Sequence, residues 1–395
     1  MNLPQSDIAA RQADSAATRR LHIVTTVNAA WNMWNFRRQM LTALLADGHR
    51  VTVLAPSDEA VDRLVDLGCE FHPLEMDIKS LNPFAQLGLF FAMFRAFRQL
   101  RPDLVLGFTI KNNTFGSIAA RLLGIPFIPN VTGLGTAFLS GKFLQRVAHL
   151  LYRVSFAGCP LVFFQNRDDS ALFTGLNLVR EDQVVVVPGS GIDLVHFAQA
   201  PMPAHDGPVQ FLMIARLLRD KGVVEYVEAA KMVRESHPGT RFLLLGPAGS
   251  ENRTAFSAEQ AHEWERTHGI EYLGPSDDVR PHIEQAHCVV LPSYREGAPR
   301  TLIEAAAIGR PLIASDVPGC HDIVDDGSNG LLCTVRDAES LASAMRRFLD
   351  MEAQQWATMG QEGRDKMVRE YDVAHVANAY RRAIADITGM SAITD

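Results

Sequence analysis

Long apolar runs are missing from this sequence of 395 residues. The longest notable one, LGLFFAMF at residues 87–94, ends at Arg95, far short of the ~18–20 apolar residues that cross a bilayer. The first 19 residues also lack the apolar core of a signal peptide, so we interpret residues 1–19 as a flexible tail. We therefore expect neither a membrane-spanning helix nor a secretion signal.

Cysteine and metal-binding patterns are equally scarce. The five cysteines form no CxxC pair and no dense framework, which favours reduced thiols over a disulfide scaffold. The 13 histidines show no ligand spacing, and no Asp-x-Asp pair occurs anywhere, which weakens a mechanism that holds a divalent cation on a nucleotide diphosphate. A P-loop, a GxGxxG motif after a strand, HExxH and GxSxG are absent as well. We expect no metal and no cofactor.

Positive charge is in short supply and unevenly distributed. The net charge of -7 argues against non-specific nucleic-acid binding. Residues 1–187 hold 18 Lys and Arg against 15 Asp and Glu, a balance of +3, whereas residues 188–395 hold 20 against 30, a balance of -10. This asymmetry fits two domains with different partners.

What the sequence does contain is a repeated alternation of short apolar runs and helical patterns. Fully apolar strands separated by helices indicate parallel sheets covered on both faces. The expected strands are 21–27, 50–56, 69–74, 103–109, 126–131, 160–166 and 183–189 in the first half, and 209–215, 241–246, 270–274, 288–293, 310–315 and 330–334 in the second. The pattern predicts two doubly wound α/β domains in tandem, facing each other across a ligand cleft.

Domain boundaries follow from composition. Residues 188–208 are rich in Gly and Pro, which is typical of a linker. We place the first domain at 20–190 and the second at 191–370. The sequence is helical from about 337, including a long segment at 353–388, and we expect the final helix at 371–395 to cross back to the first domain.

The most informative segment is residues 293–319, SYREGAPRTLIEAAAIGRPLIASDVPG. A strand ends near Ser293, a loop carries Glu296, and Pro299 suits the first position of a helix that contains Glu304. Free amides at that helix start favour an anionic group such as a diphosphate. Glu296 is suited to sugar hydroxyls and Glu304 to two ribose hydroxyls. Carboxylate capping of the helix is the alternative for one isolated Glu, but the whole string is too specific for it.

A second segment, residues 214–230, carries two cations at a strand–helix turn. Arg216 and Lys221 bracket the turn, and Gly222 follows at the helix start. A cation at that end opposes the helix dipole unless an anion arrives. The alternative is a solvated basic loop, but the pattern favours a diphosphate clamp.

Together these motifs resemble a known family. R-x4-K at Arg216 and Lys221 with E-x7-E at Glu296 and Glu304 is similar to the retaining GT-B glycosyltransferases of family 4, as is GSGID at 189–193. More narrowly, the chain resembles the bacterial subgroup that extends undecaprenyl-diphosphate-linked sugars, which includes the N,N'-diacetylbacillosaminyl-diphospho-undecaprenol α-1,3-N-acetylgalactosaminyltransferases. The similarity extends from about residue 21 to about 385, and the segments that carry the closer match are 108–126, 131–138, 163–169, 215–222 and 291–320.

The resemblance implies a GT-B fold and a role for each matching residue. Arg216, Lys221 and Glu296 would be the catalytic group, the two cations on the donor diphosphate and Glu296 on the donor sugar. Glu304 would bind the ribose, and Gly246 and Leu273 would border the uracil. The donor-binding residues implied in this way are Gly246, Leu273, Gly297, Ala298, Pro299, Arg300, Leu302 and Glu304.

Two features depart from the family pattern. The segment Asn28–Asn35 occupies the place of the family's Gly-rich first loop but contains no Gly. The region NVTGLGTAF at 130–138 lacks the histidine that many members place there. No protein general base is assigned, and the departing diphosphate is expected to take the acceptor proton itself.

Acceptor binding is expected on the first domain. Asn28, Lys111 and Asn112 follow strands that end in the proposed cleft, and a cation there suits an acceptor diphosphate, although a solvated Lys is an equal alternative. Residues 84–101 and 138–156 combine aromatics with arginines and are either crossover helices or helices on anionic lipid. For 84–101 we favour the core, and for 138–156 the choice stays open, with the resemblance favouring membrane contact.

The sequence thus predicts a cytoplasmic hexosyltransferase, peripheral at the inner face of the cytoplasmic membrane, retaining and metal-independent. It would move a sugar, an N-acetylhexosamine, from a UDP-sugar to an undecaprenyl-diphosphate-linked saccharide in surface-glycan assembly, with no nucleic-acid partner. The alternatives are a soluble or lipopolysaccharide-core acceptor, or a non-catalytic nucleotide-sugar-binding protein.

Overall fold

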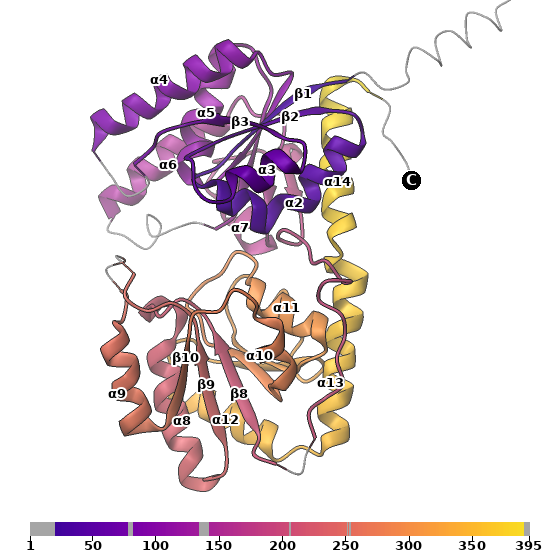
Figure 1. Cartoon of the computed structure of the whole chain (residues 1–395). Helices are drawn as coiled ribbons and strands as arrows, with labels where there is room; N and C mark the ends of the chain where they lie inside the picture. The colour runs from indigo at the N-terminus through magenta and orange to yellow at the C-terminus, as the bar shows by residue number, and fades with distance from the viewer. Residues whose placement is uncertain are drawn as a thin grey trace, which may run out of the picture. The chain divides into compact units, whose positions relative to one another are not determined.

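The computed structural model describes residues 20–77, 82–133, 142–204, 207–250, 252 and 254–390. The chain divides into two compact units (Figure 1). The first unit runs to Ser190 and takes in the chain again from Val373, and the second is Gly191–Asp372. The expected tail at 1–19 lies outside the described residues. The two units are best understood one at a time, because each has its own sheet and its own core.

The first unit is built on a parallel sheet of seven strands in the order β3-β2-β1-β4-β5-β6-β7. The chain moves outward from β1 in one direction to β2 and β3, then returns to β4 and moves outward in the other direction. The strands are β1 His22–Thr26, β2 Arg50–Ala55, β3 Glu70–Pro73, β4 Leu104–Phe108, β5 Phe127–Val131, β6 Val162–Phe164 and β7 Val184–Val186. The order therefore reverses between β1 and β4.

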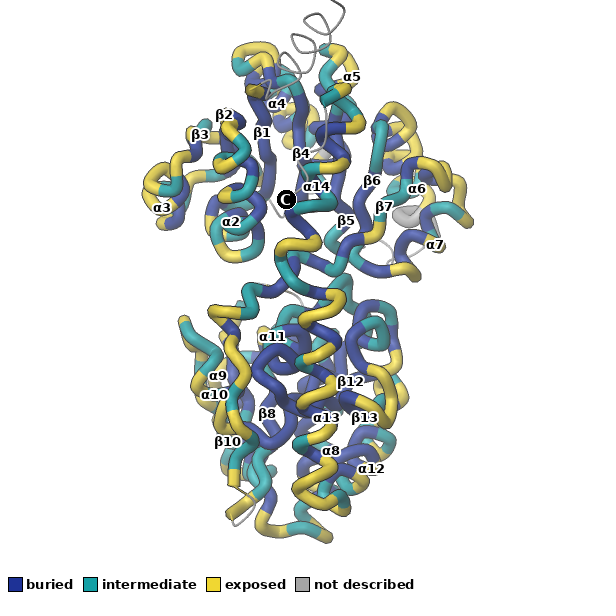
Figure 2. Tube along the Cα trace, turned by 90° about the vertical axis from the view of Figure 1, so that its right-hand side faces the viewer, coloured by how far each residue is buried: buried dark blue, intermediate teal, exposed yellow. Residues whose placement is uncertain are grey.

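Helices cover both faces of this sheet. Successive strand residues face opposite ways, so that Ile23 joins one buried cluster and Val24 the other. On the Ile23 side lie α2 Ala30–Ala46, α3 Val61–Asp66 and α14 Val373–Thr388, and on the Val24 side lie α4 Pro83–Leu100, α5 Ile110–Leu122, α6 Lys142–Phe156 and α7 Arg167–Gly175. A 3-10 turn, Glu181–Gln183, precedes β7. Most strand residues are buried, because helices cover both faces of the sheet (Figure 2). This explains why the strands are unbroken apolar runs in the sequence.

Two helix boundaries differ from the sequence-based expectation. Helix α2 starts at Ala30, so Asn28–Asn35 is not a loop; only three residues connect β1 to the helix, since nothing in the segment interrupts the helical spacing of its buried residues. The expected 353–388 helix is broken at Asp372, whose extended backbone separates the π-helical turn Met367–Tyr371 from α14.

The second unit repeats the architecture with six parallel strands in the order β10-β9-β8-β11-β12-β13. Here the order reverses between β8 and β11. The strands are β8 Gln210–Ile214, β9 Arg241–Leu245, β10 Ile270–Gly274, β11 Cys288–Leu291, β12 Leu312–Ser315 and β13 Gly330–Cys333. The two sheets confirm the predicted α/β fold.

The helices of the second unit again form two layers. On one face lie α8 Val223–Ser236, α9 Ala258–His268 and α12 Ala338–Leu349, and on the other lie α10 Arg280–Gln285 and α11 Arg300–Ile308. A 3-10 turn, Arg219–Lys221, leads into α8, and α13 Ala353–Lys366 packs against α11.

A buried arginine fastens the linker to this unit. Arg310 is fully buried, and its guanidinium donates to the carbonyl oxygens of Ala200, Pro201 and Ile283, at 3.1, 2.6 and 3.2 Å. Burial lowers the pKa of Arg310 to about 10, so the side chain keeps its charge at neutral pH. Charge-assisted hydrogen bonds from one buried guanidinium thus tie two linker carbonyls and the end of α10 together.

We therefore predict that Arg310→Ala lowers the free energy of unfolding of the second unit by about 3 kcal/mol, because it removes three charge-assisted hydrogen bonds and leaves a void in the core. Chemical denaturation followed by Trp fluorescence measures the loss. The exposed Arg347→Ala is the matched control and should change little. An Arg310→Ala protein as stable as the control would contradict this role.

Candidate functional site

The predicted donor motifs meet at the reversal point of the second sheet. The chain leaves β8 toward one edge and β11 toward the other, and open parallel sheets bind ligands in the crevice outside the carboxyl ends of the strands at such a reversal point. Arg216 and Lys221 lie in the segment that follows β8, and Glu296 lies in the segment that follows β11. Two motifs separated by about 75 residues of sequence therefore become neighbours.

Glycines allow the backbones here to approach closely. Gly222 has a φ of 77°, and a Cβ at this position would collide with the carbonyl oxygen of Pro292, just after β11. Gly246, after β9, has a φ of 145°, and its Cβ would collide with the carbonyl oxygen of Ala215, just after β8. The ends of three neighbouring strands are thus packed backbone against backbone.

At this reversal point Lys221 forms an ion pair with Glu296. The two side chains are 24% and 12% exposed, so the pair is partly shielded from solvent but open to a ligand. The hydroxyl of Ser293 lies 2.7 Å from the same carboxylate oxygen of Glu296 and 3.1 Å from the carbonyl oxygen of Asp220. Arg216 is exposed, and the structure gives its side chain no partner among the described residues. One cation is therefore held in place and one is available.

Helix α11 adds an anion-binding end to the crevice. Pro299 is its N-cap rather than its first residue, and no side chain caps the helix or places a carboxylate in its first turn. The hydroxyl of Thr301 donates to the carbonyl of Ile214 at 3.0 Å, which fixes this end beside β8. Leu302 is fully buried and its amide donates to the carbonyl of Pro299 at 3.1 Å, so its side chain is closed to a ligand. The uncapped amides favour an anion at this position.

Glu304 lies one turn into α11, and its side chain is only 13% exposed. Arg300 donates to its carboxylate at 2.9 Å, and Arg300 also lies 3.4 Å from the carbonyl oxygen of Gly191. Burial raises the pKa of Glu304, and the charge of Arg300 opposes this shift. The structure thus gives the Arg300 side chain a task that the sequence did not indicate, namely to hold Glu304 in place.

The expected uracil neighbours lie along the adjacent strands. Gly246 donates its amide to the carbonyl of Gly274 at 2.8 Å and accepts at its own carbonyl from the hydroxyl of Tyr272 at 3.0 Å. Leu273 is 37% exposed near the end of β10. Gly297 and Ala298 are half-buried in the loop before α11. All of the expected donor residues therefore gather at the carboxyl edge of this sheet.

Three residues at this edge were missed by sequence reasoning: Ser293, Tyr294 and Tyr272. Ser293 was visible only as the end of a strand, and Tyr294 only as part of the motif. Their contacts depend on which strands lie side by side, and no local pattern carries that information.

The acceptor candidates lie at the reversal point of the first sheet. Asn112 is fully buried; its amide donates to Thr26 Oγ1 and its oxygen accepts from Thr109 Oγ1, both at 2.8 Å, so it ties α5 to β1 and is closed to a substrate. Lys111 is half-buried and donates to the carbonyl of Asp77 at 2.8 Å, and burial lowers its pKa. Asn28 is half-buried and accepts from Asn32 at 3.4 Å. Lys111 and Asn28 are the candidates that a ligand can reach.

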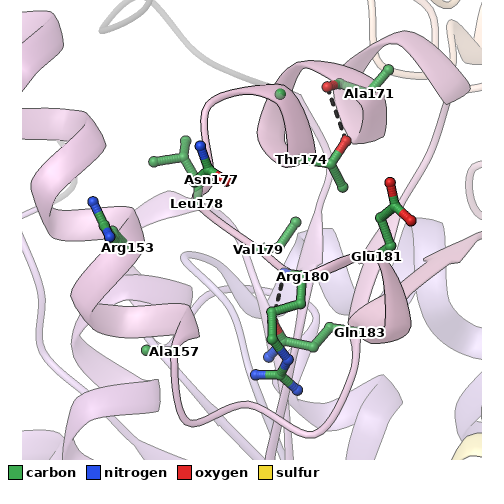
Figure 3. Close-up of a pocket in the computed structure, with 11 residues that line it drawn as sticks. Arg153, Ala157, Ala171, Thr174, Asn177, Leu178, Val179, Arg180, Glu181 and Gln183 are labelled. Atoms are coloured by element: carbon green, nitrogen blue, oxygen red, sulfur yellow. Dashed lines mark hydrogen bonds between the residues drawn. The ribbon is translucent and has the colours of Figure 1, made fainter.

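Figure 3 shows a depression of about 550 Å³ that belongs to neither reversal point. It is lined by the C-terminal parts of α6 and α7 and by residues 177–183. Helices α6 and α7 end where β6 and β7 begin, which places the depression at the amino edge of the sheet. It is therefore not a candidate for the substrate site of an α/β sheet.

Comparison with known proteins agrees with this geometry. The model of the glycosyl transferase 4-like domain matches residues 33–190, and that of glycosyl transferases group 1 matches residues 198–366. The chain is 29% identical over 369 residues to the N,N'-diacetylbacillosaminyl-diphospho-undecaprenol alpha-1,3-N-acetylgalactosaminyltransferase of Campylobacter jejuni, covering 89% of this chain and 95% of that one.

Two further proteins are similar. The UDP-Gal:alpha-D-GlcNAc-diphosphoundecaprenol alpha-1,3-galactosyltransferase of Escherichia coli is 26% identical over 324 residues, covering 77% of this chain and 78% of its own. The structure of Anabaena Alr3699/HepE in complex with UDP and glucose superposes with a TM-score of 0.76 at 17% identity, covering 93% of this chain and 100% of that one. The chain therefore belongs to the GT-B glycosyltransferases, with a glycosyl transferase 4-like domain followed by a group 1 domain.

Proposed function

We propose that this glycosyltransferase moves an N-acetylhexosamine from a UDP-sugar to an undecaprenyl-diphosphate-linked saccharide, with retention and without a metal ion. The observation that carries the proposal is the shielded Lys221–Glu296 pair beside an unpaired Arg216. Two relatives named above act on diphosphoundecaprenol-linked sugars, and one of them uses UDP-Gal. These names support the choice of donor nucleotide and acceptor class.

Donor binding would break the Lys221–Glu296 ion pair, so that Lys221 contacts the diphosphate and Glu296 contacts the donor sugar. The donor diphosphate draws Lys221 away from Glu296 and is held by Arg216, Lys221 and the uncapped amides of α11. Glu296, released from the lysine, accepts hydrogen bonds from the donor sugar. Glu304, held in place by Arg300, accepts from the ribose hydroxyls.

The chemistry then needs positioning and charge stabilisation more than a protein base. The bond between the sugar C1 and the β-phosphate oxygen breaks, and the acceptor oxygen bonds to C1 on the same face. The acceptor proton passes to the departing diphosphate oxygen. Because the diphosphate lies on the face that the acceptor attacks, it accounts both for the retained configuration and for the destination of the proton. The two cations stabilise the negative charge that develops on the diphosphate, which takes the part that a metal ion plays in other transferases.

Two helices of the first unit offer a surface for the acceptor's membrane. Helix α6 exposes Val147, Leu150, Leu151 and Val154, which are 39 to 63% exposed, with Arg146 and Arg153 also exposed on the same helix. Spacing of three and four residues puts these apolar side chains on one outward face. Large exposed apolar faces mark interaction sites, and neighbouring arginines favour anionic lipid.

Helix α4 presents a similar outward face, while its other face joins the core as expected from the sequence. Its inner residues are buried, including Met93 and Phe97, but Phe84, Leu87 and Phe91 are 83, 52 and 56% exposed. Helices α4 and α6 both pack against α5 on the same face of the sheet. None of the described helices is long and apolar enough to span a membrane. We therefore propose peripheral contact with the inner face of the cytoplasmic membrane.

The donor assignment predicts that Lys221→Ala lowers kcat at least 100-fold, because the leaving diphosphate loses a cation in a shielded site. Release of UDP from a panel of UDP-sugars with short polyprenyl-diphosphate saccharides measures kcat, and product mass identifies the transferred sugar. Lys231→Ala is the control, since this exposed lysine lies on α8, the helix that follows Lys221.

Normal kcat in Lys221→Ala would contradict the role of this lysine. Wild-type protein that hydrolyses no UDP-sugar and transfers to no lipid-linked acceptor would contradict the proposed reaction. Transfer to a soluble saccharide alone would replace the acceptor class and keep the donor site.

The membrane assignment predicts that the double variant Leu150→Asn/Val154→Asn loses several-fold in binding to phosphatidylglycerol vesicles, because it removes apolar area from the outward face of α6. Co-sedimentation measures the bound fraction. The control is Val195→Asn, which alters the even more exposed (89%) Val195 of the second unit. Equal binding by the double variant and the control would contradict contact through α6.

A further inference from the structure

We propose that Tyr294 is a positioning residue that sets the distance between Lys221 and Glu296 by holding the β8–α8 turn on both sides of Lys221. This inference rests on the proposed function, because it concerns the same diphosphate clamp. Tyr294 follows Ser293 directly and precedes Glu296 by two residues, so any shift of its backbone carries Glu296 with it.

Tyr294 forms two hydrogen bonds to the β8–α8 segment, one on each side of Lys221. Its amide donates to the carbonyl of Asp220, the residue before Lys221, at 2.9 Å. Its hydroxyl donates to Glu225 Oε1, in the first turn of α8 and four residues after Lys221, at 2.8 Å. The hydroxyl of Ser293 lies within 3.1 Å of the same Asp220 carbonyl oxygen. Lys221 is thus enclosed between two contacts that originate from the loop of its own ion-pair partner.

The hydrogen bond from the Tyr294 hydroxyl to Glu225 is maintained across the neutral pH range. Burial raises the pKa of Tyr294 to about 12, and the hydrogen bond to Glu225 adds to the rise, so the hydroxyl remains a donor throughout the neutral range. The guanidinium of Arg336 lies over the ring of Tyr294, 4.5 Å from its centre, and fixes the plane of the ring. A neutral donor to a carboxylate is a charge-assisted bond, which is stronger than one between neutral groups.

Glu225 depends on this donor. Its second carboxylate oxygen, Oε2, is buried and has no hydrogen-bond partner among the described residues. Without the Tyr294 hydroxyl, neither oxygen of this carboxylate, four residues after Lys221 in the sequence, would have a donor that the structure records. The carboxylate would then compete with Glu296 and with the incoming diphosphate for the ammonium group of Lys221. Tyr294 therefore keeps one carboxylate occupied so that the lysine is available for the ligand.

The test is a double-mutant cycle on UDP binding with Tyr294→Phe, Glu225→Leu and the pair together. Titration calorimetry gives the Kd of UDP, turnover gives KM and kcat for the UDP-sugar, and denaturation reports stability. We expect Tyr294→Phe to raise the Kd of UDP about tenfold while the protein stays folded, because the phenyl ring still lies under Arg336. Glu225→Leu should relieve the competition, so the double variant should bind UDP more tightly than Tyr294→Phe alone.

Tyr226→Phe is the matched control. Tyr226 is the next residue of α8, and its hydroxyl lies 3.0 and 3.1 Å from the core carbonyl oxygens of Phe211 and Leu243, either of which can accept its proton. Its loss should reduce stability and leave the Kd of UDP unchanged. Glu225→Gln keeps an acceptor for the Tyr294 hydroxyl and should retain nearly wild-type affinity.

The outcomes separate this inference from the function on which it rests. If wild-type protein binds UDP and Tyr294→Phe binds it equally well, the positioning role is wrong and the donor site stands. If Tyr294→Phe and Tyr226→Phe lose affinity only in proportion to lost stability, the role is merely structural and the inference is overturned. If wild-type protein does not bind UDP, both proposals fail.

Discussion

The close approach of two chain segments at the reversal point of the second sheet is the constraint on which the donor site depends. Strands β8 and β11 lie side by side, and Gly222 lets the turn after β8 press against Pro292 after β11. This contact places a lysine near the start of α8, where the helix dipole disfavours a cation, and supplies Glu296 as its partner. The charges of Lys221 and Glu296 therefore balance each other, and an anionic ligand would compete with Glu296 for the lysine.

Local positive charge accounts for the proposed binding of an anionic ligand by the acidic half of the chain. The second half carries the charge balance of -10, yet its crevice concentrates Arg216, Lys221 and the uncapped end of α11. Local donors a few ångströms from a phosphate outweigh a diffuse surface charge that salt screens. The exposed apolar and basic residues of α4 and α6 are the basis on which we propose that the first unit contacts a membrane surface.

Much of the fold could be predicted from the sequence because strands buried on both faces are unbroken apolar runs. All thirteen strands that the structure describes fall within the expected segments. Helix ends were less predictable. Helix α2 begins at Ala30 without a capping side chain, and no Gly or Pro near Asp372 indicates that a helix ends there. Regular periodicity continued through both positions, so no local signal separated helix from connection.

The site could be predicted where the residue types themselves carry the chemistry. Arg216, Lys221, Glu296 and Glu304 were accessible in this way, since cations and carboxylates near helix starts have few structural uses. Residues that act by positioning other side chains could not be predicted in this way. Whether Asn112 serves a ligand or ties α5 to Thr26, and whether Tyr294 reaches Glu225, depends on which strands pair across the sheet.

A crystal structure of the protein with UDP tests the central claim most directly. We predict diphosphate density outside the carboxyl ends of β8 and β11, with the ammonium of Lys221 within hydrogen-bond distance of a phosphate oxygen and no longer paired with Glu296. Diphosphate bound elsewhere, or bound there with the Lys221–Glu296 pair intact, would contradict the exchange of ion pairs on which the proposed function rests.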